Sequence, residues 1–327
     1  MLLRFDRRTR LGATTHRRKK SRRSRLTLYS MLATVALLCG AIWLGPYFVL
    51  QPRVQTLPSK VPFSQQEWMS YIPESAQFVA YVNYQAAFEA TGNRSFFGTD
   101  PLLEVYSPPF TIYSNSVEYE LGINLAGPGA TQGVPAVSVI KIGLDEARNL
   151  ETALNSDPGL HRSEHESHEI FSLLIRRKEL QVPLVSASIA INGQHVLLAQ
   201  GAASAASVIQ VLDAADHSQK QLFSKSSAQT ALYASSGGDD RYLALFIAAF
   251  PTQVEGSNIA MKTVTTDSEG FTSRFAFSFN STDQARAHYD SIKRLYNGGK
   301  DYWLLGPFVV ATFEYDLSKL ADQIRGL

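Results

Sequence analysis

The amino-acid sequence predicts an α+β protein, with a single N-terminal transmembrane helix followed by an exported domain of antiparallel sheets with helices on one face. Three observations predict this fold class. Residues 26–50 form a run of 25 residues without Asp, Glu, Lys, Arg or His, and such a helix is long enough to cross a hydrocarbon core of about 30 Å. The rest of the chain alternates strand-like and helix-like segments. The order of these segments is similar in its two halves.

Residues 1–25 set the predicted orientation. They contain 11 Lys and Arg residues and one acidic residue, Asp6, for a net charge of +10, whereas the remainder carries 20 basic and 28 acidic residues, for a net charge of −8. Basic segments beside a membrane span stay in the cytoplasm. The predicted localisation is therefore the cell membrane, single-pass, with a cytoplasmic N-terminus and an extracytoplasmic C-terminal domain. A cleaved signal peptide is the alternative, but its apolar region would be only about 7–15 residues long.

Composition divides the chain into six predicted segments. They are a basic cytoplasmic tail (1–25), a transmembrane anchor (26–50), a Pro-containing spacer (51–62), a first exported α+β unit (63–215), a Ser- and Gln-rich connector (216–232) and a second exported α+β unit (233–327). The only cysteine, Cys39, lies in the apolar run. The exported part must therefore be stabilised by its core and not by disulfides, which a chain of this size can manage.

Hydrophobic periodicity predicts the elements of both units. In the first unit we expect strands at 78–84, 110–113, 117–123, 136–142, 169–176, 184–191 and 195–199, and helices at 85–90, 144–154 and 204–212. In the second unit we expect strands at 242–250, 259–266, 271–279 and 308–315, and helices at 282–296 and 317–325. Asn192-Gly193 separates two strand-like runs, which predicts a tight hairpin.

The two units align with each other. Residues 78–84 match 242–250, residues 136–154 match 274–292, and residues 195–212 match 308–324. This predicts two duplicated β-β-β-α-β-β-α units. Each unit is expected to carry its two helices on one face of its own antiparallel sheet, which would leave the opposite sheet faces, or the seam between the units, as the binding surface.

Two longer phrases resemble a known family. They are YIPESAQFVAYVNY at 71–84 and VSASIAINGQHVLLAQGAASAASVIQVLDA at 185–214. Together with the apolar run they resemble the DUF3352-type membrane-anchored exported domains, which carry no established activity. The resemblance implies an architecture and a location, and it implies no catalytic residues.

The sequence contains none of the common catalytic motifs that we considered. G-x-x-x-x-G-K-[ST], C-x-x-C, H-E-x-x-H and G-x-S-x-G are all missing from it. The glycine-rich residues 127–133 precede a strand, whereas a phosphate-binding loop follows a strand and opens a helix. Ser138 and Lys141 fit S-x-x-K, but on a strand they would point to opposite faces. We therefore predict that the protein is not an enzyme and needs no cofactor.

The best candidate for a site is a histidine cluster. His161, His165 and His168 lie among three carboxylates, and imidazole with carboxylate suits zinc or copper. On a helix the three histidines would share one face, but the residues that follow are strand-like. We therefore predict no metal site there, so that zinc titration should show no tight binding. His195, His217 and His288 are isolated, and we expect them to be ordinary.

The partners follow from this organisation. Residues 26–50 are expected to contact the lipid bilayer and the basic tail anionic lipid, whereas nucleic acid is not expected because few aromatic residues accompany the arginines. The exported domain is predicted to bind an envelope protein, glycan or lipid without catalysis. The alternatives are an extracytoplasmic enzyme with an unrecognised site and a metal-binding or sensing domain built on the cluster from His161 to His168. Asn93 and Asn280 begin N-x-[ST] sequons, which are acceptors for N-glycosylation where the host glycosylates exported proteins.

Overall fold

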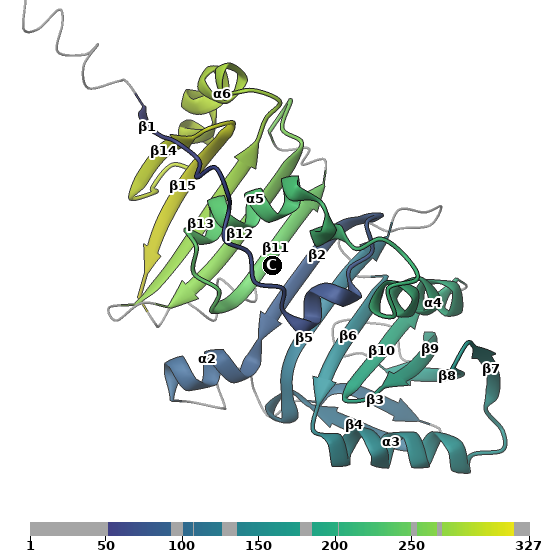
Figure 1. The fold of residues 1–327 in the computed structure, drawn as a ribbon. Coiled ribbons are helices and arrows are strands. Elements are labelled where there is room, and N and C mark those ends of the chain that lie inside the picture. The colour runs from purple at the N-terminus through teal and green to yellow at the C-terminus, as the bar shows by residue number, and fades with distance from the viewer. Residues whose placement is uncertain are drawn as a thin grey trace, which may run out of the picture. The chain divides into compact units, whose positions relative to one another are not determined.

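The computed structural model describes residues 52–92, 101–106, 108–125, 136–176, 185–201, 203–249, 254–266 and 270–316. Residues Arg53–Leu327 form one compact unit (Figure 1). The apolar run at 26–50 lies outside the described residues. Within the described residues, none of the helices has the length and apolar character needed to cross a membrane.

A single continuous sheet forms the centre of this unit. In the described residues it has 15 strands, in the order β1-β14-β15-β13-β12-β11-β2-β5-β6-β10-β9-β8-β3-β4, with β7 also paired to β8. Only β1 and β14 are parallel among the described pairs. The strands are β1 Arg53–Gln55, β2 Ala76–Asn83, β3 Pro101–Tyr106, β4 Pro109–Tyr113, β5 Val117–Leu125, β6 Val137–Ile142, β7 His161–His165, β8 His168–Arg176, β9 Val185–Asn192, β10 His195–Gln200, β11 Tyr242–Ala249, β12 Ile259–Thr266, β13 Phe271–Ser278, β14 Asp301–Leu305 and β15 Phe308–Tyr315.

Helices cover both faces of the sheet. The described helices are α2 Tyr84–Thr91, α3 Leu144–Ser156, α4 Ser204–Ala215, α5 Ser226–Ser236 and α6 Thr282–Leu295, with the 3-10 turns η1 Glu67–Tyr71, η3 Ser114–Ser116 and η4 Leu222–Ser224. Helices α4 and α5 and turns η1 and η4 pack on one face, which we call the α4/α5 face. Helices α2, α3 and α6 pack on the other, the α3/α6 face.

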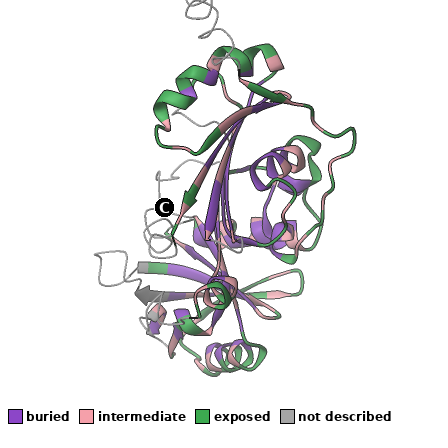
Figure 2. Cartoon of the chain, turned by 90° about the vertical axis from the view of Figure 1, so that its left-hand side faces the viewer, coloured by how far each residue is buried: buried purple, intermediate pink, exposed green. Residues whose placement is uncertain are grey.

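Strand β6 shows why both faces are covered. Val137 and Val139 point to the α4/α5 face, whereas Ile140 and Ile142 point to the α3/α6 face, and all four are buried. Successive side chains of a strand point to opposite faces. A strand that is apolar at nearly every position therefore needs a layer on each side, and Figure 2 shows buried strands between helices whose outer surfaces are exposed.

Helix α6 illustrates how the sequence defines a covering helix. Ala285, Tyr289 and Ile292 are buried at a spacing of three to four residues, which places them on one stripe facing the sheet. Ser281 caps the first turn, since its side chain accepts a hydrogen bond from the Gln284 backbone at 3.2 Å. The helix was predicted at 282–296, and its observed bounds agree within one residue.

The predicted fold class is wrong. The two expected units do not form separate sheets, because β2 and β11 pair with each other and join both halves into one sheet. Nor do the helices lie on one face: α3 and α4, expected together, lie on opposite faces. The predicted transmembrane helix is not part of the fold that the described residues show. The strand orders β2-β5-β6-β10-β9 and β11-β12-β13-β15-β14 correspond, but the predicted pair of duplicated units is wrong, because the two halves share one sheet and α3 and α4 lie on opposite faces.

The structure describes most of the segment predicted to be a spacer. Residues Arg53–Gln55 add to the edge of the sheet as β1, and the Gln55 carbonyl accepts a hydrogen bond from the Gly306 backbone at 3.2 Å. In the middle of the segment, the partly buried Leu57 packs against the core on the α4/α5 face. Directly after the segment, the ring of Phe63 stacks on Phe223 with 6.1 Å between centroids. The predicted spacer therefore packs along the domain.

Candidate functional site

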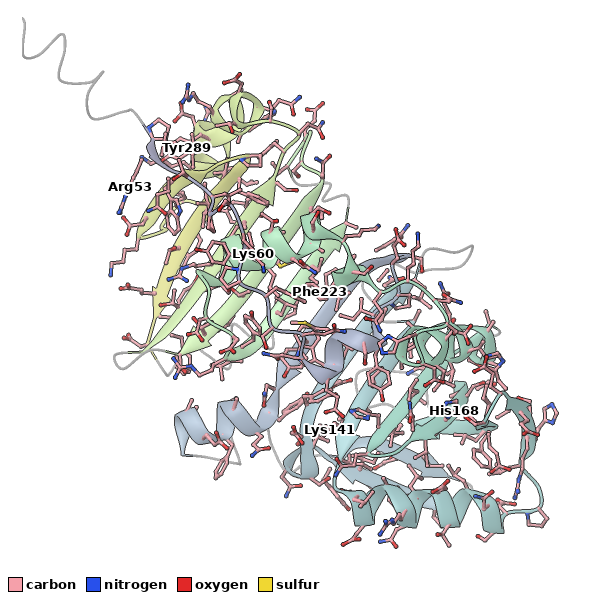
Figure 3. The ribbon with its side chains drawn as sticks, viewed as in Figure 1. Arg53, Lys60, Lys141, His168, Phe223 and Tyr289 are labelled. Atoms are coloured by element: carbon pink, nitrogen blue, oxygen red, sulfur yellow. The ribbon has the colours of Figure 1, made fainter. Side chains whose placement is uncertain are left out.

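A network of charged and polar side chains lies on the α4/α5 face, under η1. We call it the Lys141 network, and it consists of Glu67, Glu118, Tyr119, Lys141 and His195. The Lys141 Nζ atom lies 2.8 Å from the Glu67 carboxylate and 3.2 Å from that of Glu118. The lysine side chain is only 14% exposed, whereas those of Glu67 and Glu118 are 54% and 41% exposed. The network thus reaches from the core to solvent, and Figure 3 labels Lys141 on β6.

The buried end of the network is a tyrosine–histidine pair. The Tyr119 hydroxyl lies 2.7 Å from His195 Nε2, and His195 Nδ1 lies 3.3 Å from the Asn192 carbonyl. Because a carbonyl oxygen can only accept, Nδ1 must carry the hydrogen. In the neutral ring Nε2 then accepts the hydrogen bond that the Tyr119 hydroxyl donates. Both ring nitrogens of His195 are therefore engaged.

Burial and charge shift the pKa values of these groups. Burial lowers the pKa of His195 below 6.5, although the nearby Glu67 carboxylate opposes the shift. Burial, with Glu67 adding to it, raises the pKa of Tyr119. Burial by itself lowers the pKa of Lys141, but the hydrogen bonds to Glu67 and Glu118 outweigh it and the net shift is upward. At neutral pH the network therefore contains a neutral histidine, a neutral tyrosine and a charged lysine.

A pocket of about 300 Å³ adjoins the network at the ends of β5 and β6. We call it the Gln194 pocket. Its wall combines two aromatic rings with amides, hydroxyls and one carboxylate, and it includes Tyr84, Gln85, Phe88, Asn115, Glu118 and Gln194. Lys and Arg are not among its described lining residues. Glu118 belongs to both the pocket and the Lys141 network, so the network holds one wall of the pocket in place.

Two amides of the pocket are available for a ligand. Among the described contacts, the side chains of Asn115 and Gln194 make no hydrogen bond to the protein, although the backbone carbonyl of Gln194 accepts from Ile142 at 3.0 Å. Gln194 lies in the β9–β10 turn beside Gly193, whose φ of 61° only glycine adopts readily. Asn115 lies in η3. Both amides are therefore presented from short, defined turns.

The sequence candidates lie elsewhere. His165 and His168 face each other across the β7–β8 hairpin, and His161 lies at the far end of β7. Of the histidines expected to be ordinary, His217 contacts Gln221 and His288 stacks on Phe279.

His195 is the histidine that the sequence reading missed. Its partner Tyr119 is 76 residues away in the chain, so no local pattern signals the pair.

Ser138 and Lys141, the residues that fit S-x-x-K, both lie in β6 and point to opposite faces of the sheet.

The predicted glycosylation sites have different outcomes. Asn280 is exposed, and its side-chain oxygen accepts a hydrogen bond from Asn258 at 2.9 Å. The adjacent helix cap is formed by Ser281 and not by Asn280. Asn93, the glycine-rich residues 127–133 and the predicted helix at 317–325 lie outside the described residues.

Comparisons with known proteins give no further evidence about the function of this chain. No protein-family model matches the chain, and no curated protein matches it. Among solved structures, crystal form III of TP0453 has 8% sequence identity and a TM-score of 0.39, covering 79% of this chain and 98% of that chain. Crystal form IV has 9% identity and a TM-score of 0.38, covering 81% and 97%. Similarity at this level carries no argument about function. The resemblance to DUF3352-type domains stays a prediction.

Proposed function

We propose that this protein is a binding module without catalytic activity, and that the Gln194 pocket takes a neutral, hydroxyl-rich ligand of the glycan class. The observation that carries the proposal is the chemistry of the pocket wall. Amides and hydroxyls match the donors and acceptors of sugar hydroxyl groups, and the rings of Tyr84 and Phe88 offer apolar surface for the C–H face of a sugar ring.

The charge of the wall favours a neutral ligand over an anionic one. Glu118 is the only charged residue among the described lining residues, and it would repel phosphate or carboxylate groups. Its Oε1 atom binds Lys141, which leaves Oε2 to accept from a ligand hydroxyl. A charge-assisted hydrogen bond of this kind is stronger than a neutral one.

The enzyme alternative has weaker support. His195 would be the obvious general base, but it is only 4% exposed and both ring nitrogens are engaged within the protein. A general base must come within hydrogen-bond reach of the substrate proton that it abstracts. The Lys141 network is better suited to fixing the position of Glu118 than to proton transfer.

Location outside the cytoplasm remains part of the proposal. It rests on the net charge of +10 in residues 1–25 and on the uncharged residues 26–50. Protease added to intact cells should digest a tag placed after Leu327 and leave a tag at Met1 protected. Digestion of the Met1 tag alone would reverse the proposed orientation.

A glycan array tests the ligand class. The full-length chain should bind neutral oligosaccharides in preference to sulfated or sialylated ones. Gln194→Ala and Asn115→Ala should each weaken binding roughly 3- to 10-fold, as expected for the loss of one hydrogen bond. Gln210→Ala is the matched control, since Gln210 is an amide on α4 that contacts Ser75 and does not line the pocket. Preferential binding of acidic glycans, or no binding at all, would refute the proposal.

A further inference from the structure

The β7–β8 hairpin is held against α4 by two parallel histidine–aspartate pairs. His165 Nε2 lies 2.7 Å from Asp213 Oδ1, and His168 Nε2 lies 2.9 Å from Asp216 Oδ2. The two histidines are directly opposite each other across the hairpin, and the two aspartates are one helical turn apart. Each pair joins residues 48 positions apart in the sequence. The sequence predicts no metal site there because the residues that follow the cluster are strand-like, but α4 and its C-cap residue bring two carboxylates to the two histidines.

The first pair has a third potential ligand beside it. Ligand atoms of His165, Glu166 and Asp213 all lie within 4.8 Å of one another. A zinc ion binds nitrogen and oxygen ligands at about 2.0–2.2 Å, so small rotations of these side chains would bring all three to one ion. Glu166 is exposed in the turn of the hairpin and can rotate without disturbing the core. His161 is four residues before His165 on β7, about 13 Å away along the strand, and is too far to contribute.

The charges around this point favour a cation. Asp213 lies in the last turn of α4, where the helix dipole places partial negative charge. Among the described residues, Asp213 and Asp216 form ion pairs only with the two histidines. Glu166, Asp213 and Asp216 thus bring three carboxylates together near the end of a helix.

A second layer of contacts orients one ligand. Gln219 Nε2 donates to Asp213 Oδ2 at 3.0 Å, which turns Oδ1 toward His165. Supporting hydrogen bonds of this kind are typical of carboxylate ligands in metal sites. The side chains of His165 and Asp213 are 29% and 17% exposed, so an ion can reach the site from solvent.

We propose that His165, Glu166 and Asp213 form a binding site for a divalent transition-metal ion of the zinc class. One imidazole and two carboxylates suit Zn²⁺ better than Ca²⁺, which prefers six to eight oxygen ligands. With three protein ligands the fourth position holds water. The bound ion would join the hairpin turn to α4, and it acts independently of the Gln194 pocket.

Isothermal titration of the full-length chain with ZnCl₂, on protein without a histidine tag, tests this proposal. We expect one saturable zinc site in the wild type. His165→Ala and Asp213→Asn should each lower the zinc affinity by more than about 100-fold, because even the residues that support metal ligands contribute 10- to 100-fold to metal affinity. Glu166→Gln should weaken it less. His168→Ala is the matched control, because it removes the neighbouring histidine–aspartate pair from the same hairpin and leaves all three ligands.

The outcomes separate a metal site from a structural clamp. Zinc binding that persists in His168→Ala and disappears in His165→Ala, with unchanged far-UV circular dichroism in both, supports the site. The absorption bands of bound Co²⁺ should likewise persist in His168→Ala and disappear in His165→Ala. Equal loss in both histidine variants would show that the hairpin contact alone matters, and it would overturn the proposal. An absence of saturable binding in the wild type would overturn it too.

Discussion

The Tyr119 hydroxyl donates a 2.7 Å hydrogen bond to Nε2 of His195, and both residues are register partners of Lys141, from opposite sides of β6. The two side chains come from strands that are both paired with β6 but not with each other. Since His195 is buried, a ring nitrogen that lost its hydrogen-bond partner would cost free energy. This contact therefore links the core of the sheet to the Lys141 network.

Removing this hydroxyl should destabilise the fold. Tyr119→Phe leaves His195 Nε2 buried without a donor, which costs about 1–3 kcal/mol. Urea unfolding at pH 7.5 measures the change. Tyr84→Phe is the control, because it removes a hydroxyl whose 3.2 Å contact to Glu120 is only partly buried. An equal loss in the free energy of unfolding in both variants would show that the Tyr119–His195 hydrogen bond stabilises the fold no more than the partly buried Tyr84–Glu120 contact does.

Stability should fall as the pH is lowered below about 6.5. Burial holds the folded-state pKa of His195 below its ordinary value of 6.5, so the unfolded chain binds a proton first. The stabilisation is fully present above the unfolded pKa and is lost as the pH falls through the folded pKa. Glu67, which faces the ring at 3.6 Å, moderates the effect. Between pH 8 and pH 5, the free energy of unfolding should fall less in His195→Gln than in the wild type. Equal falls in the two proteins would show that His195 does not cause the pH dependence.

Lys262 is a second buried titratable group. It lies on the α3/α6 face of β12, with Nζ 5.6 Å from the ring centre of Phe246 and 5.3 Å from that of Phe275. Burial lowers the pKa of Lys262 from 10.5 to about 8. Between these values the unfolded chain holds a proton that the folded protein has released, so this group makes stability rise with pH from about 8 to 10.5.

Replacing Lys262 by methionine should remove that dependence. Lys262→Met keeps the side-chain length and eliminates a buried charge, so the free energy of unfolding at pH 7 should rise by about 1–3 kcal/mol. Urea unfolding of the wild type and of Lys262→Met at pH 7 and pH 9.5 tests both the rise in stability and the loss of its pH dependence. Lys300→Met, which removes an exposed lysine paired with Glu314, should change stability by less than about 1 kcal/mol. A destabilised Lys262→Met variant would mean that the charge is well compensated.

Local patterns predicted individual elements better than their assembly. Asn192-Gly193 predicted the β9–β10 hairpin, and the structure confirms it with His195 paired to Asn192. Helix α5 is not predicted, because residues 226–232 fall in the Ser- and Gln-rich segment interpreted as a connector and the rest of the helix lies at the start of the second predicted unit. The faces of the helices and the pairing of β2 with β11 depend on contacts between distant segments. Such contacts leave no periodic signal in the sequence.

The site was unpredictable for the same reason. Glu67, Tyr119, Lys141 and His195 come from four elements, and each is unremarkable in its own segment. The sequence predicts an ordinary role for His195 because this histidine is isolated in the chain. The histidine cluster is conspicuous in the sequence, but Asp213, the carboxylate that completes the proposed metal site, lies on α4. Only the folded sheet brings either set together.

We propose that the Gln194 pocket binds a neutral glycan through the side-chain amides of Asn115 and Gln194, which make no hydrogen bond among the described residues. The most direct measurement is a titration followed by NMR, in which the full-length chain receives the neutral oligosaccharide that scores highest on the array. We expect the side-chain amide signals of Asn115 and Gln194 to shift together and saturate, while that of Gln210 stays in place. Shifts confined to other residues, or an unchanged spectrum at saturating sugar, would contradict it.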